Sequence, residues 1–294
     1  MQEFIDRFPT EASCRQYLVD IKWKGEFICP SCLGTEAWKL GRGNFKCKAC
    51  RRIVSVTSGT VFQDSHIPLR TWFLAMWSVV SQKQGVSALG LSRTLGVDQK
   101  TGWYLLQRIR TAMVRAGRER LSGTVEIDEV FIGGVKPGIG GRGALGKTLI
   151  LVAVEDTGKG IGRIRIEVIP DASATSLRKA IEKMVEPGST IRTDEWKGYT
   201  KAALKGYHHT IMKRQARSPG EDPTPLVHRV SSLLKRWLLG THQGGVQTTH
   251  LRGYLDEFIF RFNRRTSRFR GLLFYRLVQG MIQERKRVLV ASST

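Results

Sequence analysis

The chain has 294 residues, of which 41% are hydrophobic, and its 48 Lys and Arg residues outnumber 25 Asp and Glu residues to give a formal net charge of +23. The hydrophobic content excludes a largely disordered chain, and the length allows two or three domains. A positive charge of this size, spread along the whole chain, favours a long nucleic-acid track; a basic protein without a polyanionic partner is the alternative.

No segment predicts export or a membrane span. Residues 1–30 lack the basic-then-apolar pattern of a signal peptide, and the longest purely apolar run is only Leu149–Val154. We therefore expect a cytoplasmic, nucleoid-associated protein with no membrane contact. In such a compartment the five cysteines indicate metal binding rather than disulfides.

Four cysteines form the first motif in chain order. Cys29-Pro-Ser-Cys32 and Cys47-Lys-Ala-Cys50 are two C-x-x-C knuckles, and the fourteen residues between them can form a hairpin. Two such knuckles supply four thiolates for a tetrahedral Zn²⁺ in a zinc ribbon. All four positions are filled, so the zinc is predicted to be structural; redox-active or unrelated thiols are the alternative. Cys14 is expected to be a small core residue of an amphipathic helix.

Residues 66–116 have the apolar spacing of helices and contain a candidate helix-turn-helix. Gly96 fits the turn and Asp98 fits the N-cap of the second helix. The first helix has three apolar residues on one face: Ala88, Leu91 and Leu95. The second carries three basic residues that we predict to contact DNA: Lys100, Arg108 and Arg110. A packed helix pair without a DNA contact has the same spacing and remains an alternative.

Strand patterns begin near residue 123. Residues 124–133 alternate between apolar and polar, 148–156 form an apolar run, and 162–172 alternate again. A helix at about 173–186 and a short strand at 190–196 follow. This order predicts an α/β fold with a ribonuclease H-like mixed sheet flanked by helices, in which the fourth strand lies parallel beside the first.

Two aspartates fall on neighbouring strands of that sheet. Asp128 lies in the first strand and Asp194 at the end of the fourth, 66 residues later, so both carboxylates can converge on one site. Two carboxylates in a basic protein are typical of a two-metal phosphoryl-transfer site that binds Mg²⁺ or Mn²⁺. Taken alone, either aspartate could instead face solvent or cap a turn.

A later helix, "PLVHRVSSLLKRWLLG" (225–240), places His228 and Lys235 on one face, seven residues apart. Together these blocks resemble the bacterial insertion-sequence transposases of the DDE type, in the subgroup with an N-terminal zinc ribbon. The resemblance runs through nearly the whole chain. It is carried by both cysteine knuckles and by "EIDEVFIGG" (126–134), "TDEWKGY" (193–199), "SLLKRWLLGTHQG" (232–244) and "HLRGYLDEFIFRFNRR" (250–265).

The resemblance implies a catalytic core that cuts and joins DNA with a divalent metal, Mg²⁺ or Mn²⁺. The enzyme would bind the terminal inverted repeats of its element, free a 3′-hydroxyl and direct it at target DNA. No covalent protein intermediate and no nucleotide cofactor are expected. By the same analogy we expect a homodimer or higher multimer on DNA.

Asp128 and Asp194 match the first two acidic positions of the family, but the third position differs. The family more often has Glu or Asn there, seven residues before a lysine; counting back from Lys235 gives His228. A neutral imidazole suits softer metals than Mg²⁺ and adds no negative charge. A catalytically weak or inactive DNA-binding regulator therefore remains the alternative. Lys235 is expected to contact a phosphate near the scissile bond.

Other acids near these positions are given no catalytic role. Asp256 and Glu257 are the rival third acids, and we predict that they lie on the exposed face of their helix. Glu129 and Glu195 are predicted to point to the other face of their strand or into a loop, because neighbouring side chains on a strand alternate.

The segment Gly141–Thr148 matches the G-x-x-x-x-G-K-T phosphate-binding loop. A true loop of this type opens a helix, but the β-run 149–156 follows here, so a nucleotide hydrolase is not expected. We predict instead a loop between the first two strands that contacts DNA phosphates through Lys136, Arg142 and Lys147. Further DNA contacts are predicted at Arg236, Arg264 and Arg265.

These patterns divide the chain into four expected parts. They are an N-terminal helix with the zinc ribbon (1–60), a helix-turn-helix-like DNA-binding domain (61–120), the ribonuclease H-like catalytic domain (121–270) and a basic helical C-terminal segment (271–294).

Overall fold

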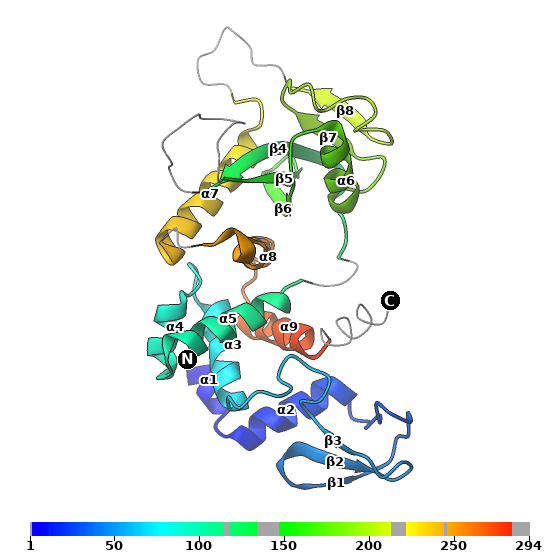
Figure 1. Cartoon of the computed structure of the whole chain (residues 1–294), viewed down its shortest axis with the longest axis vertical. Helices are drawn as coiled ribbons and strands as arrows, with labels where there is room; N and C mark the ends of the chain where they lie inside the picture. Colours follow the sequence, from blue (N-terminus) through cyan, green and yellow to red (C-terminus); the bar gives the residue numbers. More distant parts are fainter. Residues whose placement is uncertain (1, 115–117, 134–146, 213–221, 244–245, 284–294) are drawn as a thin grey trace. The chain divides into compact units, whose positions relative to one another are not determined.

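The computed structural model describes residues 2–114, 118–133, 147–212, 222–243 and 246–283. The chain divides into two compact units (Figure 1): Met1–Arg115 with Ser267–Thr294, and Ala116–Thr266. Our finer boundaries at residues 60 and 120 stay predictions. No helix in the described part of the chain combines the length and the apolar character that a membrane crossing requires.

The first unit combines helices with a small sheet. The sheet has three short antiparallel strands: β1 (Ala37–Lys39), β2 (Asn44–Cys47) and β3 (Ile53–Ser55), with the 3₁₀ turn η1 (Gly41–Gly43) between the first two. Its helices are α1 (Gln2–Arg7), α2 (Glu11–Trp23), α3 (Leu69–Ser81), α4 (Ala88–Leu95), α5 (Gln99–Thr111) and α9 (Arg270–Gln283). Cys14 is fully buried on α2, which confirms its predicted place in the core.

The C-terminal helix α9 belongs to the core of this unit. Phe274 packs edge-on against Phe73 of α3, with ring centroids 5.4 Å apart. The backbone of α9 also approaches the end of α5 closely, because a Cβ added at Gly280 would lie 2.2 Å from the carbonyl oxygen of Ala112. The C-terminal segment is helical over residues 270–283, as expected, and has a packed apolar side.

The second unit is built on one five-stranded mixed sheet. Its strands are β4 (Thr124–Ile132), β5 (Thr148–Asp156), β6 (Ile161–Val168), β7 (Thr190–Thr193) and β8 (His208–Ile211), in the order β6-β5-β4-β7-β8. The first three strands pair antiparallel, and β7 lies parallel to both β4 and β8. The fourth strand thus lies beside the first, as the ribonuclease H-like prediction required. The edge strand β8 was not predicted.

Helices cover both faces of this sheet. Helix α6 (Ala174–Met184) closes one apolar cluster with Ile127 and Leu151 of the central strands. Helices α7 (Pro225–His242) and α8 (Leu251–Phe262) close a second cluster on the other face, with Val130 and Val152; the 3₁₀ turn η3 (Thr248–His250) joins them. Alternate residues of β4 therefore face different helices, and even-numbered ones face α7.

The prediction that Asp256 and Glu257 lie on an exposed helix face was wrong. Their relative exposures are 7% and 0%. Helix α8 is covered on more than its apolar side, because the guanidinium groups of Arg252 and Arg118 lie 3.2 Å and 3.9 Å from Asp256. Burial raises the pKa of Asp256, and the two arginines oppose that rise. These contacts indicate a structural ion-pair network.

Candidate active site and zinc centre

The four cysteines of the two knuckles meet at one point. Their sulfur atoms all lie within 4.8 Å of one another, and the Cys29–Cys50 and Cys32–Cys47 pairs are each 3.6 Å apart. Four sulfurs bound to one Zn²⁺ at about 2.3 Å are about 3.8 Å apart, so the cluster fits tetrahedral zinc. Zinc in this position would be structural, because protein fills all four ligand positions.

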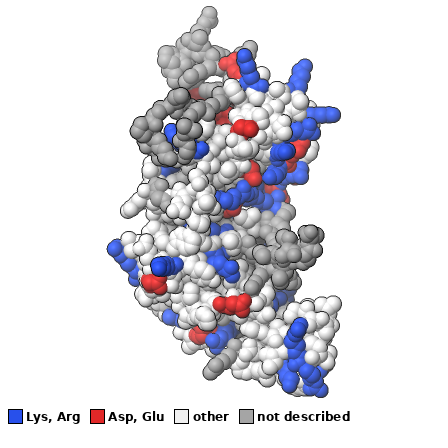
Figure 2. Space-filling view, viewed as in Figure 1, with Lys and Arg blue, Asp and Glu red and all other residues white. Residues whose placement is uncertain are grey.

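Both knuckles reach this geometry with the same local backbone. The residue after the second cysteine of each, Leu33 and Arg51, has φ of 62°. Its amide donates a hydrogen bond to the carbonyl of the first cysteine, at 3.0 Å in both cases. This repeated turn aims two thiols inward from each knuckle. Lys and Arg side chains gather over the surface of the ribbon (Figure 2), including the exposed Lys39, Lys48, Arg51 and Arg52.

Helices α4 and α5 form the predicted helix-turn-helix. Gly96 ends α4 with φ of 66°, and the Asp98 carboxylate caps α5 by accepting a 2.8 Å hydrogen bond from the Thr101 amide. Gly102 allows the helices to touch, because a Cβ there would lie 2.7 Å from the Ala88 carbonyl oxygen. A close packed pair of this kind is the geometry in which helix-turn-helix proteins present their second helix to DNA.

The predicted DNA contacts on α5 differ in exposure. Lys100 is exposed. Arg108 is partly buried, and its guanidinium donates to the Val61 carbonyl at 2.8 Å. Arg110 is buried, with 2% relative exposure, so our prediction of a surface contact there was wrong. Its position on the inner face of α5 follows from the helical period, which also buries Leu106.

In the second unit, Asp128 lies near the middle of β4 and faces α7. Its carboxylate is 14% exposed; one oxygen accepts from the Glu129 amide at 2.7 Å and the other from the Thr224 hydroxyl at 3.2 Å. Burial raises the pKa of Asp128, and the negative charge of Asp194 raises it further. Two carboxylates that disfavour each other's charge form a site that a bound cation would stabilise.

Glu126 fixes where α7 begins relative to Asp128. It is two residues before Asp128 on the same face of β4, is 3% exposed, and accepts a 2.7 Å hydrogen bond from the Val227 amide. This amide belongs to the first turn of α7, whose N-terminal amides lack partners within the helix. Thr224, the N-cap residue, makes no side-chain cap, so Glu126 replaces it. Our search for catalytic residues missed this carboxylate.

The docking of α7 brings His228 to Asp128, 100 residues away in the chain. His228 Nε2 lies 3.1 Å from Asp128 Oδ2. Two ligand atoms bound side by side to an octahedral ion at about 2.0–2.1 Å would be about 3 Å apart, so the pair suits one divalent cation. The imidazole is about half exposed, at 49%, and therefore open to a substrate.

Asp194 follows β7 directly, beside the parallel strand β4. The Trp196 amide donates to its carboxylate at 3.0 Å, and its carbonyl accepts from the buried Thr193 hydroxyl at 2.8 Å. Among the described residues, only the four cysteines form a group of three or more potential ligands with all atoms within 4.8 Å, so Asp194 is not in such a tight group with Asp128 and His228. A site for two ions about 3.5–4 Å apart does not require all of its ligand atoms to lie in one such group.

Of the acids next to these residues, Glu129 interacts on the α6 face of β4, as predicted, but it also borders the cavity that His228 and Lys235 line. The odd-numbered side chains of β4 face α6, and Glu129 interacts there with Tyr199, a buried phenol. Burial first, and then the negative charge of Glu129, raise the pKa of Tyr199 well above its usual value. Glu195 is exposed in the turn after Asp194.

A cavity of about 290 Å³ opens beside the Asp128–His228 pair. Lys235 lines it together with His228 and Ser231 from α7 and Phe131 from β4. The described structure thus brings His228 and Lys235 to one hollow, as their seven-residue spacing predicted. An ammonium group that lines the same cavity as the His228 imidazole can hold a phosphate that enters it.

The remaining predicted DNA contacts are scattered. Lys147 stands directly before β5, so a strand rather than a helix follows the glycine-rich segment; Lys136 and Arg142 lie outside the described residues. Arg236 is exposed on α7. Arg264 stacks on Phe260 at 4.1 Å, and Arg265 donates to the carbonyls of Ile161 and Gly162. The last two arginines therefore take part in the packing of the unit.

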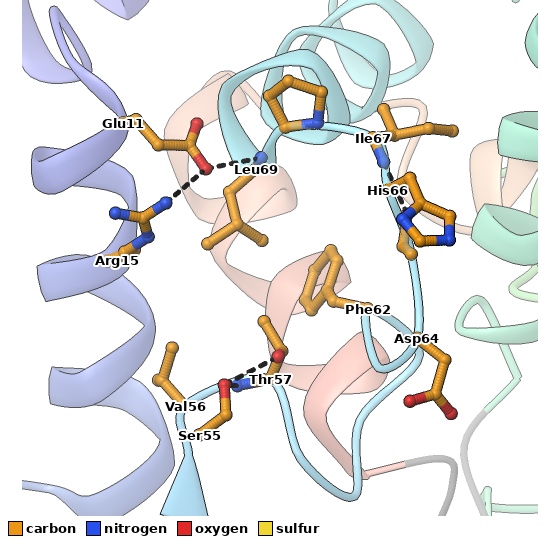
Figure 3. Close-up of a pocket in the computed structure, with 12 residues that line it drawn as sticks. Glu11, Arg15, Ser55, Val56, Thr57, Phe62, Asp64, His66, Ile67 and Leu69 are labelled. Atoms are coloured by element: carbon orange, nitrogen blue, oxygen red, sulfur yellow. Dashed lines mark hydrogen bonds and ion pairs between the residues drawn. The ribbon is translucent and has the colours of Figure 1, made fainter. Parts of the chain in front are cut away.

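A second cavity, of about 600 Å³, lies in the first unit between α2 and the segment before α3 (Figure 3). Its main charged groups pair with each other: Glu11 accepts from the amides of Leu69 and Arg70, both at 2.9 Å, and lies 3.5 Å from Arg15. The carboxylate thus closes the N-terminus of α3. We assign this cavity a structural role.

Two family models match the parts of the chain that contain the four clustered cysteines and the Asp128–His228 pair. The model of the transposase zinc-ribbon domain matches residues 9–52, and that of the ISXO2-like transposase domain matches residues 120–263. Residues 9–52 are therefore similar to a transposase zinc ribbon, and residues 120–263 are similar to an ISXO2-like transposase domain. The second match spans Asp128, Asp194, His228 and Lys235.

One relative aligns with most of this chain, and the alignment also covers most of the relative. It is 29% identical over 285 residues, which cover 87% of this chain and 92% of the relative, an uncharacterized protein in the transposable element ISH50 of Halobacterium salinarum. Because this relative is haloarchaeal, the bacterial origin that we expected stays a prediction.

Two solved structures also resemble it at low identity. The catalytic core of BIV integrase is 18% identical with a TM-score of 0.34, covering 58% of this chain and 96% of the integrase core. The Mos1 transposase paired-end complex is 14% identical with a TM-score of 0.30, covering 74% and 78% of the respective chains.

Proposed function

We propose that this protein is a DNA transposase that binds the terminal inverted repeats of an insertion sequence, cuts there and joins the ends to target DNA. The observation that carries the proposal is the convergence of Asp128 and His228 at 3.1 Å, inside the matched transposase domain. The net charge of +23 suits a protein that must hold donor and target DNA together.

Asp128, Asp194 and His228 would hold the divalent metal, Mg²⁺ or Mn²⁺. When bound, the metal would stabilise the negative charge that develops on the phosphate oxygens during in-line displacement. Asp128 is central, because it interacts with both other groups: through its 3.1 Å contact with His228 and through its repulsion with Asp194. Zn²⁺ would have only a structural role, in the ribbon.

The side chains around the metal site would orient the DNA. Lys235 would bind a phosphate at the cavity beside His228, and the exposed Lys100 on α5 would contact DNA further away. Lys136, Arg142 and Lys147, together with Arg236, remain proposed phosphate contacts. A dimer or higher multimer is part of the proposal, because each transposition event joins two element ends.

Strand cleavage on duplexes that carry the element's ends tests this function. Wild-type protein with Mg²⁺ or Mn²⁺ is expected to nick at the ends, and Asp128→Asn and Asp194→Asn should each reduce the rate about 100-fold or more, because transition-state charge is left unstabilised. Glu182→Gln is a matched control, since Glu182 is an exposed acid on α6 in the same unit. Unchanged cleavage by both aspartate variants would show that the assigned site is wrong.

A second candidate is a DNA-binding regulator that no longer cuts. His228 favours it, because an imidazole in place of an acidic ligand reduces the negative charge available to Mg²⁺. End-specific footprints without cleavage in either metal would support this candidate over the transposase. Cleavage that appears only in His228→Glu would identify the histidine as the inactivating change.

A further inference from the structure

Asp222, just before α7, lies against the candidate metal site from the side opposite Asp128. Its Oδ2 is 2.6 Å from His228 Nδ1, while His228 Nε2 is 3.1 Å from Asp128 Oδ2. One imidazole is thus held between two carboxylates. The Asp222 side chain is one-third exposed, so the contact depends on how firmly its own backbone holds it.

The segment around Asp222 is built to hold that carboxylate still. Its second oxygen, Oδ1, accepts a 3.0 Å hydrogen bond from the Thr224 amide, so both oxygens have partners. Pro223 and Pro225 flank Thr224 and fix two backbone φ angles of the turn. The Thr224 hydroxyl donates to Asp128 Oδ2 at 3.2 Å and so ties the same turn to the other carboxylate.

The contact between Asp222 and His228 determines which nitrogen of the imidazole ring carries a proton. An ionised carboxylate only accepts hydrogen bonds, so at 2.6 Å the proton must be on His228 Nδ1. When Nε2 binds a metal the ring is neutral, and its Nε2 lone pair points toward Asp128 Oδ2, 3.1 Å away. One divalent cation can bind both atoms. The arrangement is therefore that of a metal-binding histidine oriented by a carboxylate behind it.

We propose that Asp222 is a positioning residue, which fixes the Nδ1–H tautomer of His228 and supplies the negative charge that the histidine itself lacks. The proposal rests on the proposed function, because it assumes that His228 Nε2 binds the divalent metal. Asp222 acts through His228 and does not itself touch the metal or DNA. Carboxylate, imidazole and metal would then do together what a single acidic side chain does at this position in related sites.

Manganese affinity measures this role without any DNA. Free Mn²⁺ is followed by electron paramagnetic resonance during titration of the full chain. Asp222→Ala is expected to weaken Mn²⁺ binding about 10–100-fold, as loss of a carboxylate behind a metal-bound histidine does in other sites. Asp222→Asn, which loses the charge and keeps an acceptor oxygen for only one of the two hydrogen bonds, should lie between wild type and Asp222→Ala. Glu182→Gln is the control and should bind as wild type does.

The tautomer of His228 is a second readout that a merely structural role would not change. Long-range ¹H–¹⁵N spectra of Mg²⁺-loaded protein should show Nδ1–H in wild type and a mixture with Nε2–H in Asp222→Ala; the signal is assigned by its loss in His228→Gln. A double-mutant cycle completes the test. In a His228→Glu background, Asp222→Asn should no longer weaken Mn²⁺ binding.

Three results separate the possible failures. If Asp222→Ala and Asp222→Asn both bind Mn²⁺ as wild type does and His228 keeps Nδ1–H, the positioning role is wrong. If Asp222→Asn weakens binding equally with His228→Glu present, Asp222 acts by a route other than His228, which also overturns the proposal. If Asp128→Asn binds Mn²⁺ as tightly as wild type, the metal site itself, and with it the proposed function, is wrong.

Discussion

Glu126 and Asp128 lie on the same face of β4, two residues apart, and the structure gives them different tasks. Glu126 holds the first turn of α7 through the Val227 amide, and Asp128 meets the side chain that this turn presents, His228. The first contact is a condition for the second, because α7 would otherwise lack a fixed register against β4. One buried carboxylate is thus structural and its neighbour is available to a cation.

The pH dependence of stability distinguishes the two roles. Burial raises the pKa of Glu126 above its usual 4.5, although the amides of Val227 and Leu226 oppose the rise. The folded state therefore keeps this proton to higher pH than the unfolded state, and the contribution of Glu126 to the free energy of unfolding falls as pH rises above 4.5. Glu126→Gln retains an acceptor for the Val227 amide but cannot ionise.

We expect the variant Glu126→Gln to gain stability relative to wild type as pH rises from about 4 to about 7. Urea unfolding at a series of pH values measures the difference in free energy between the two proteins, so contributions from all other carboxylates cancel. A difference that stays constant with pH, or that decreases, would contradict the assignment of a raised pKa to Glu126.

The identity of the third ligand should set the metal preference. Imidazole suits softer ions than Mg²⁺, and carboxylate suits Mg²⁺ and Mn²⁺ alike. We therefore expect the ratio of cleavage rates in Mn²⁺ and Mg²⁺ to fall about tenfold in His228→Glu, mainly through a faster reaction in Mg²⁺. His228→Gln, which removes the ring without adding charge, serves as control. A ratio equal to wild type in His228→Glu would mean that position 228 does not bind the metal.

Sequence reasoning could name some of these residues and not others, for a physical reason. Asp128 and Asp194 stand in blocks that resemble a known family, and His228 stands seven residues before Lys235, which lies in another such block. Glu126 and Asp222 act through contacts that no local pattern displays: Glu126 bonds an amide 101 residues away. The prediction for Asp256 was wrong because an amphipathic pattern indicates one covered face and does not show that Arg118, from outside the helix, lies against the polar face.

At the scale of the elements, the zinc ribbon should depend on its metal. Its three strands have three or four residues each, too short to form a stable sheet without another support. We expect about one zinc per chain, and its removal by a chelator should expose the amides of β1–β3 to hydrogen exchange. The β4–β7 pairing in the other unit should keep its protection.

Cysteine variants provide the matched test of this prediction. Cys47→Ser should lose zinc, whereas Cys14→Ser should retain it, because Cys14 is buried on α2 and outside the four-sulfur group. Elemental analysis of the purified variants decides between them. Retention of zinc by Cys47→Ser together with its loss from Cys14→Ser would overturn the assignment of the ligands.

The helix-turn-helix offers a test of packing between two elements. Gly102→Ala would place a methyl carbon 2.7 Å from the Ala88 carbonyl oxygen, so α4 and α5 must separate. We expect a loss of roughly 1–3 kcal/mol in the free energy of unfolding, measured by urea titration. Gly240→Ala on α7 is the control, because nothing lies within 4 Å of the added carbon; it should be neutral or slightly stabilising. Equal effects of the two substitutions would contradict the close packing.

The sequence predicted the order of the strands and helices better than it predicted how many of them there are. The four strands and the crossover helix α6 follow from alternation and length, and their parallel and antiparallel pairing follows from connection rules. Strand β8 escaped prediction because its four residues, His208–Ile211, are mostly polar and make a strand only by pairing with β7. Helix α9 was expected as a basic helical segment, and its apolar residues, such as Leu277, lie in the core of the first unit.

At the scale of the whole molecule, each compact unit would bind a metal of its own. The first unit would contain structural Zn²⁺ at four cysteines, and the second a catalytic divalent ion at Asp128 and His228, with Asp194 beside it. The large positive charge would serve DNA binding by both units. The central claim is the second metal, since cleavage of DNA ends depends on it.

Anomalous X-ray diffraction from crystals grown with Mn²⁺ tests that claim most directly. Data collected on both sides of the manganese and zinc absorption edges distinguish the two metals. The account predicts a zinc peak at the four cysteines and a manganese peak in contact with Asp128 and His228, with Asp194 on the same ion or a neighbouring one. A zinc peak in the ribbon without any manganese peak at Asp128, at saturating Mn²⁺, would contradict it.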